Sequence, residues 1–337
     1  MTTACSCSAL ARLSLALAWA VFAATISTHS AALAGSPAAS DFPNLPEPIS
    51  SFGAAISDGW LYVYSGHTGE AHVHTSKNLA QRFDRVKLGG GSSWESLPFD
   101  QPLQSNALVA YKSAIYRVGG LSVLNGPGEK EDLESVTNFE RYDPAQKSWK
   151  KLAPLPAPRS SHDAVVLGDK LYVVGGWNLG KEKSWQANAL SIDLSNEHAQ
   201  WKDVPEQPFR RRALAAAAHH NRIYAIGGMT ADDKPSTDVH YFDVATQKWS
   251  AGPSLPGKGM QGFGCSACEA HGKLIATTMD GSVHELSADG TEWKTLGKLK
   301  QPRFFHRLLA WSEGVLAIGG ASEAGHLNNI EYFAIPK

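Results

Sequence analysis

Residues 171–176 read LYVVGG, and this pattern of a short apolar run ending in paired glycines returns elsewhere in the chain. It returns as IYRVGG at 115–120, IYAIGG at 223–228 and LAIGG at 316–320. A run of β-branched and aromatic residues ending in glycine predicts a buried strand, because glycine lets the backbone turn where the strand stops. The basic unit of the sequence is therefore a strand followed by a glycine pair.

Each unit continues with a loop of variable length, a second apolar run and a tryptophan, which recurs at positions 94, 149, 201, 249 and 293. Self-similarity at about 40 to 50 residues, with several short strands per unit, is typical of a β-propeller. Alignment on the glycine pairs gives six units, two of them with degenerate pairs: Ser65-Gly66, Gly119-Gly120, Gly175-Gly176, Gly227-Gly228, Thr278-Met279 and Gly319-Gly320.

The order of apolar strand, glycine pair, variable loop, Tyr or Phe followed by Asp, and Trp resembles the kelch repeat. The resemblance covers nearly everything after residue 42. It implies an all-β fold, a six-bladed kelch-type β-propeller, formed as a single domain by residues 35–337. Kelch propellers host unrelated activities, so the resemblance does not settle the function.

The ends of the chain predict how the ring closes. The sixth unit ends without its tryptophan strand, while the segment starting at Phe42 reads FPNLPEP and matches the segments that begin at Trp94 and Trp201. We therefore expect an N-terminal strand to complete the last blade, with Phe42 in the place of the tryptophan. Such closure removes open sheet edges.

Residues 1–34 have the pattern of a signal peptide. Arg12 precedes an apolar run from Leu13 to Ile26, which is too short for a membrane span, and Ala32-Leu33-Ala34 offers a small-residue cleavage site. An uncleaved anchor is the alternative. We therefore expect a secreted or periplasmic protein with no membrane span after removal of the signal.

The charge balance excludes some partners. The chain has 31 Lys and Arg against 32 Asp and Glu and no polybasic tract, so nucleic acid is not expected to bind. Beyond the signal only Cys265 and Cys268 remain, which predicts either two small buried thiols or a local disulfide.

The loops that lead into the innermost strands carry repeated Arg and His residues. Aligned positions place His162 and His306 in one column and, three residues earlier, Arg159, Arg211 and Arg303 in another. Guanidinium groups around a central channel would favour carboxylate or phosphate oxygens. The alternative is that these side chains bond the backbone of neighbouring blades.

The loops after the glycine pairs should open on the same face, and they contribute Trp177 and Asp280. Trp177 and Trp185 suit sugar stacking, although Trp185 could equally pack under its own loop.

The first of these loops, GHTGEAHVHT from Gly66, contains His67, His72 and His74 close to Glu70. The histidines could hold a divalent metal, with Glu70 as a further ligand, a supporting group or a general base, although the spacing matches no standard zinc motif. Solvated or purely structural histidines are the alternative. No other cofactor is indicated.

The leading interpretation is a secreted, monomeric binding protein, since no catalytic motif can be named in the sequence. Its loop-rich face would recognise a small acidic or glycan-like ligand or a protein partner through the Arg, His, Trp and Asp residues above. The alternative is a carbohydrate-active enzyme. A secreted kelch chain with an N-terminal closing strand is similar to the periplasmic N-acetylneuraminate epimerases, which implies a sialic acid epimerase (mutarotase), with Glu70 or Glu323 as acid or base.

Overall fold

Short antiparallel strands build nearly all of the described chain, as the strand–glycine unit predicts. A computed structural model describes residues 42–90 and 93–336. The predicted signal peptide at 1–34 lies outside these residues. The described part contains no α-helix, only the 3-10 turns η1 (Ser76–Asn78) and η2 (Gly259–Gly262), and no helix long and apolar enough to cross a membrane.

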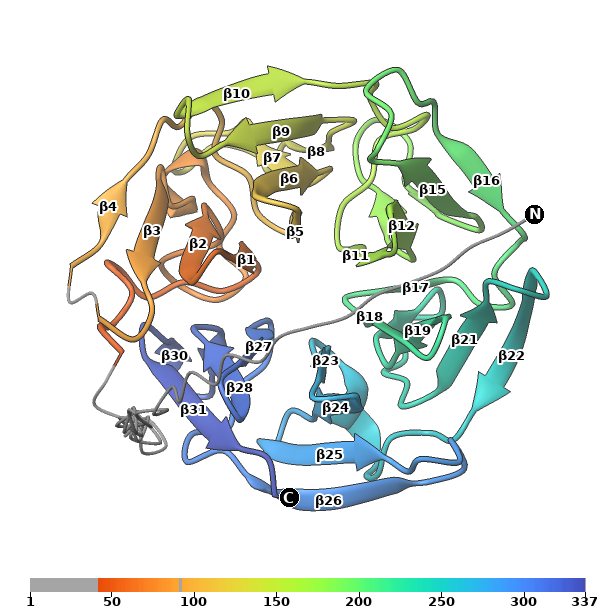
Figure 1. The fold of residues 1–337 in the computed structure, drawn as a ribbon. Helices are drawn as coiled ribbons and strands as arrows, with labels where there is room; N and C mark the ends of the chain where they lie inside the picture. Colours follow the sequence, from red (N-terminus) through yellow and green to blue (C-terminus); the bar gives the residue numbers. More distant parts are fainter. Residues whose placement is uncertain (1–41, 91–92, 337) are drawn as a thin grey trace, which may run out of the picture. The chain divides into compact units, whose positions relative to one another are not determined.

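Six sheets form the blades, in chain order around an axis (Figure 1). The first three comprise β1 (Gly53–Ser57), β2 (Trp60–Tyr64), β3 (Phe83–Lys87) and β4 (Glu95–Ser96); β5 (Ala107–Tyr111), β6 (Ala114–Val118), β9 (Phe139–Asp143) and β10 (Ser148–Lys151); and β11 (Asp163–Leu167), β12 (Lys170–Val174), β15 (Ala189–Asp193) and β16 (Lys202–Val204). The last three comprise β18 (Ala215–His219), β19 (Arg222–Ile226), β21 (Val239–Asp243) and β22 (Lys248–Gly252); β23 (Ser266–Ala270), β24 (Lys273–Thr277), β25 (Ser282–Leu286) and β26 (Trp293–Lys298); and β27 (Arg307–Trp311), β28 (Gly314–Ile318) and β31 (Ile330–Ala334).

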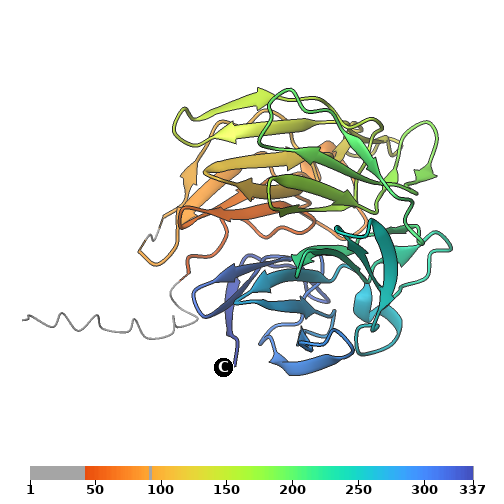
Figure 2. The same ribbon diagram turned by 45° about the vertical axis from the view of Figure 1, so that its right-hand side comes forward.

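The core of the ring lies between blades rather than inside them. Each buried apolar cluster draws its residues from two neighbouring blades, and the six clusters account for the six blade contacts, including that between the last blade and the first. In the turned view of Figure 2, neighbouring sheets lie face to face. Flat apolar strand faces explain this packing, since each sheet can bury both faces only against a neighbour.

The tryptophans of the outer strands connect consecutive blades, as their periodicity suggests. The indole Nε1 of each donates to a carbonyl of the preceding blade at 2.7–2.9 Å. For the first blade, Trp94 donates to Asn44 O at 2.7 Å. In the other blades this acceptor lies in the segment just after the outer strand of the preceding blade. The N-terminal segment has the same position relative to the first blade.

Ring closure differs in detail from the expectation. Leu45 N donates to Asn328 O at 2.7 Å and Ile49 N donates to Leu327 O at 3.1 Å, so the N-terminal segment does join the last blade. However, the sheet of the last blade has three strands among the described residues, and residues 42–49 form no strand in it. Phe42 packs on Tyr332, with ring centroids 6.5 Å apart, and is not the strand residue that replaces the tryptophan.

One face of the ring carries additional short two-stranded sheets. They are β7 (Leu121–Val123) with β8 (Leu133–Ser135), β13 (Trp177–Asn178) with β14 (Ser184–Trp185), β17 (Arg211–Arg212) with β20 (Met229–Thr230), and β29 (Ala321–Ser322) with β30 (Gly325–His326). Together with the loops after the glycine pairs they form what we call the loop-rich face. The opposite face carries the tight turns between the first and second strands of each blade.

Candidate functional site

A closed ring of backbone hydrogen bonds surrounds the axis on the loop-rich face. One residue from each blade donates its N–H to the carbonyl of its counterpart in the preceding blade, at 2.6–3.1 Å, and each has a positive φ between 50° and 63°. We call this set the axial ring: Ser51, Ser105, Ser161, Ala213, Gly264 and Phe305. Because each member bonds the blade before it, the ring ties the six blades together.

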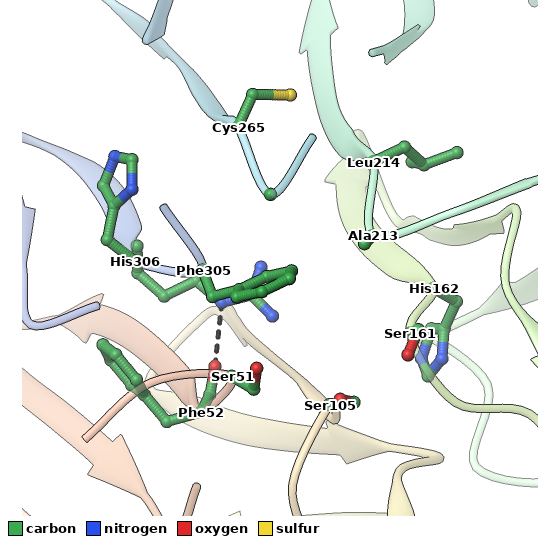
Figure 3. A pocket seen from close by; sticks show the side chains of 12 residues that line it. Ser51, Phe52, Ser105, Ser161, His162, Ala213, Leu214, Cys265, Phe305 and His306 are labelled. Atoms are coloured by element: carbon green, nitrogen blue, oxygen red, sulfur yellow. Dashed lines mark hydrogen bonds between the residues drawn. The ribbon is translucent and has the colours of Figure 1, made fainter. Parts of the chain in front are cut away.

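A small pocket of about 50 Å³ lies at the axial ring, and its lining residues are seen in Figure 3. His162 and His306 of the predicted column line it together with Phe52, Leu214 and Cys265 of the same column. Both are almost fully buried, and the His306 Nε2 lies 2.9 Å from Thr277 Oγ1. Burial lowers the pKa of His162 to about 3, with further contributions from the charges of Arg159 and Arg307. Burial also lowers the pKa of His306, so both imidazoles are neutral near pH 7.

The His162 ring acts as a wedge between the second and third blades. A Cβ added to Gly119 would lie 2.6 Å from His162 Cε1 and 2.4 Å from Arg159 O. Gly119 also has φ +53°, so both its conformation and the space beside it require glycine. Gly119, the first glycine of its pair, thus leaves room for the His162 side chain of the next blade. The sequence pattern alone did not reveal this role.

The three predicted arginines do not line an open surface. Arg159, Arg211 and Arg303 are 1%, 2% and 1% exposed. Each donates from Nη1 to the carbonyl of the first glycine of its own blade: Gly175 at 3.2 Å, Gly227 at 2.7 Å and Gly319 at 2.9 Å. Burial lowers the pKa of Arg159 and of Arg211 to about 10, so both remain charged at neutral pH. These guanidinium groups hold their blades together and expose almost no surface to a ligand.

A fourth arginine, which sequence reasoning missed, blocks the central channel. Arg307 begins the innermost strand of the sixth blade, and its Nη1 donates to Asp163 Oδ1 of the third blade at 2.8 Å. It also donates to Phe52 O and Asn106 O, both at 2.9 Å. Asp163 Oδ2 in turn accepts from Ala216 N at 2.9 Å. This pair links opposite blades across the axis.

The aligned sequence could have revealed this pair. The column that follows the His column reads Gly53, Ala107, Asp163, Ala215, Ser266 and Arg307. A single cation and a single anion stand three blades apart, and the other four side chains are small enough to leave room for them. Beyond the pair, the channel widens into a cavity of about 440 Å³ lined by the innermost strands.

The histidine loop of the first blade forms a different cluster from the predicted one. His67 is buried, and its Nδ1 lies 3.1 Å from Nε2 of His326, which comes from β30. The His67 and His74 rings lie 5.1 Å apart, whereas His72 is exposed. Burial, opposed by a hydrogen bond to Val73 O, lowers the pKa of His67 to about 4. Among residues 42–90 and 93–336, no three His, Cys, Asp or Glu side chains are placed to hold a metal ion.

The remaining predicted polar residue, Asp280, is bonded by its own loop and by Lys298 at the end of β26. It accepts from Thr278 Oγ1 and Lys298 Nζ, both at 2.8 Å, and from Ser282 Oγ at 2.9 Å. Although partial burial opposes ionisation, these hydrogen bonds hold the pKa of the carboxyl well below its usual range.

Cys265 and Cys268 are free thiols, and burial raises the pKa of each to about 12.

The loop-rich face carries a group of half-buried aromatic side chains. The Trp177 and Trp185 rings lie 5.5 Å apart, and the Phe305 ring lies 5.0 Å from Phe263 and 5.1 Å from Phe304. The Arg212 guanidinium joins the two groups, 4.3 Å from the Trp177 ring and 5.7 Å from the Phe263 ring. We call this half-buried set, which runs from β14 to the axial ring, the aromatic band.

The comparisons with known proteins agree with this architecture. A family model described as the KLHDC2/KLHL20/DRC7 Kelch-repeats domain matches residues 105–320. Kelch-like protein 25 of Xenopus tropicalis is 25% identical over 210 residues, which cover 60% of this chain and 32% of that protein. Alpha-scruin of Limulus polyphemus is 31% identical over 228 residues, covering 63% of this chain and 23% of that protein. The chain thus spans a third or less of the length of these two relatives.

Among solved structures, that of YjhT superposes with a TM-score of 0.70 at 19% identity, covering 88% of this chain and 97% of that chain. At this identity the likeness shows the fold alone. With six sheets around one axis, the kelch pattern in each unit and a family model over most of the ring, the chain belongs to the family of the KLHDC2/KLHL20/DRC7 Kelch-repeats domain.

Proposed function

We propose that the protein is a secreted or periplasmic binding protein that holds a glycan-like ligand or a protein partner on its loop-rich face. The observation that carries this proposal is the aromatic band. It brings five aromatic rings and one guanidinium group from the third to the sixth blade into contact on one face.

Such a band is suited to recognition. Aromatic rings with partly exposed faces stack on sugar rings or pack against apolar side chains, and aromatic and Arg residues dominate the binding energy of many interfaces. Met260, from η2 beside Phe263 in the chain, is 40% exposed and adds apolar surface next to the band. The rigid blades beneath hold these side chains in place before a ligand arrives, which lowers the entropic cost of binding.

Binding is favoured over catalysis by the chemistry of the axial pocket. None of the described residues that line it carries a carboxylate. The two histidines in its lining are wedged between blades, and Glu70 and Glu323, the acid or base residues expected for an epimerase, are exposed to solvent. Export is supported by the apolar segment and cleavage pattern in residues 1–34.

The test is a binding screen of the mature protein against neutral and acidic sugars and a peptide library, read by thermal shift. Hits should lose their effect in Trp177→Ala and Phe305→Ala, because both changes remove stacking surface. Trp60→Ala is the matched control. Trp60 is also half-buried and stacked by an arginine, Arg85 at 4.3 Å, but it lies at the turn end of β2. Hits that survive both band variants would refute the proposal, and faster exchange of sialic acid anomers by NMR would establish the epimerase instead.

A further inference from the structure

Arg212 lies next to the buried Arg211 on β17 but has different surroundings. Its side chain is 19% exposed and stacks on Trp177. It makes no hydrogen bond to any residue within the described ranges, and the nearest carboxylate oxygen, Asp233 Oδ1, lies 3.9 Å from Nη2. The Asp233 side chain is itself 66% exposed, so this ion pair contributes little. Arg212 is therefore a partly desolvated cation with weak neutralisation.

Arg85 shows what a satisfied arginine in the same setting looks like. Its guanidinium carbon lies 4.3 Å from the centroid of the Trp60 ring, the same distance as between Arg212 and Trp177. Arg85, however, donates from Nε to Glu95 at 2.8 Å and from Nη1 to Tyr62 Oη at 3.3 Å. Arg85 thus has hydrogen-bond acceptors in addition to its contact with tryptophan, whereas Arg212 has the contact but no hydrogen-bond acceptor among the described residues.

The donors that Arg212 leaves free point to the missing group. The Nε of Arg212 and the Nε1 of Trp177 are both buried and have no acceptor. The exposed part of the Arg212 side chain is therefore its outer end. A guanidinium whose carbon lies over an indole ring keeps the N–H groups at its edge for an incoming group, and a fork of two such N–H groups matches the two oxygens of a carboxylate. The surroundings of that edge combine the rings of Trp185 and Phe263 with a second cation, because Lys183 Nζ lies 4.8 Å from the Trp177 ring and 5.9 Å from the Trp185 ring.

We propose that Arg212, stacked on Trp177, is the subsite for a carboxylate of the ligand, carried next to an apolar ring or chain that packs on the aromatic band. This inference rests on the proposed function, because it assigns the ligand to the same face. It also relocates anion recognition by one residue, from the buried Arg211 to Arg212. An acidic sugar and a peptide terminus both offer this chemistry.

The experiment follows the indole N–H resonance of Trp177 by NMR in the ¹⁵N-labelled mature protein, assigned with Trp177→Phe. The probes are glucuronate and N-acetylphenylalanine, each compared with its neutral counterpart, glucose and N-acetylphenylalanine amide. At least one acid should shift the resonance in a saturable way, and the acid that does so identifies the source of the carboxylate. Arg212→Gln should weaken that binding roughly 10- to 100-fold, and Arg212→Lys less, because it keeps the charge without the fork.

Arg85→Gln is the matched control and should leave the affinity unchanged, and thermal unfolding verifies that each variant is folded. Equal affinity for an acid and its neutral counterpart, unchanged affinity in Arg212→Gln, or no shift with either acid at saturating concentration would overturn the carboxylate subsite. The proposed function fails separately, if ligands found in the binding screen are indifferent to Trp177→Ala and Phe305→Ala.

Discussion

The pair formed by Arg307 and Asp163 gives the sharpest test of how this ring is held together. In Asp163→Ala, Arg307 keeps its two backbone acceptors but loses its counter-charge, and the Ala216 N–H loses its acceptor. The side chains of Arg307 and Asp163 are 20% and 10% exposed, so residual solvation is small. Removal of one partner of a buried ion pair costs about 3 to 5 kcal/mol, and we expect the lower end, ~3 kcal/mol, because the site is not completely dry.

This loss should be visible as a lower melting temperature. At about 2.1 cal/mol/K per residue, a domain of about 300 residues has an unfolding entropy of ~0.6 kcal/mol/K, so ~3 kcal/mol corresponds to a shift of about 5 °C. The assay is differential scanning calorimetry of the mature protein. Arg222→Ala is the control, since Arg222 pairs with Asp243 at 3.5 Å on the surface and should cost less than about 1 kcal/mol.

A double variant separates charge from shape. Arg307→Met with Asp163→Leu removes both charges and should recover much of the stability lost by Asp163→Ala, because an uncompensated buried charge costs more than an apolar replacement of the pair. The reasoning is refuted if Asp163→Ala melts within about 1.5 °C of Arg222→Ala, a difference of ~1 kcal/mol.

Three further outcomes are expected. Burial lowers the pKa of His67 to about 4 and that of His162 to about 3, so below pH 6.5 the unfolded chain binds more protons than the folded protein. The free energy of unfolding should therefore fall by about 2 kcal/mol between pH 6 and 5. Denaturant titrations should show that the free energy of unfolding falls less steeply with decreasing pH in His162→Gln, but not in a variant of the exposed His198. Gly119→Ala should cost ~1 to 3 kcal/mol, more than Gly128→Ala, whose added Cβ meets nothing within 4 Å; equal melting temperatures would contradict the wedge. Deletion of residues 42–50, which removes the join to the last blade, should broaden the calorimetric transition, and an unchanged transition would exclude a closing role.

The fold could be predicted from the sequence because its signals are local and repeated. A strand that ends in Gly175-Gly176 has the same pattern in four of the units, and repetition turns a weak pattern into a strong one. The strand order within a blade then follows from short connections. The outer strand of the last blade is the exception, because that blade joins segments from the two ends of the chain.

The site was harder to predict because exposure is not a local property. Arg211 and Arg212 are adjacent and chemically identical, yet successive strand residues point to opposite sides, so one is buried and the other reaches the surface. Likewise the loop containing His67 was expected to need a partner from another blade, with His162, His306 or Asp280 as the candidates. The structure instead pairs His67 with His326, which is 259 residues away in the sequence.

The axial ring has a consequence for how specificity can change in this protein. Each of its six N–H groups is already donated to a neighbouring blade, so the backbone offers no donor to a molecule that settles on the axis. The six side chains of the ring, one per blade, therefore distinguish one molecule from another together with the other side chains that line the axial pocket. They are now three hydroxyls, a methyl, a hydrogen and a phenyl ring. Exchanges at the five positions that already carry a Cβ would change the selectivity of the axis and keep the present backbone conformation, whereas a Cβ added to Gly264 would lie 2.8 Å from the Phe305 ring.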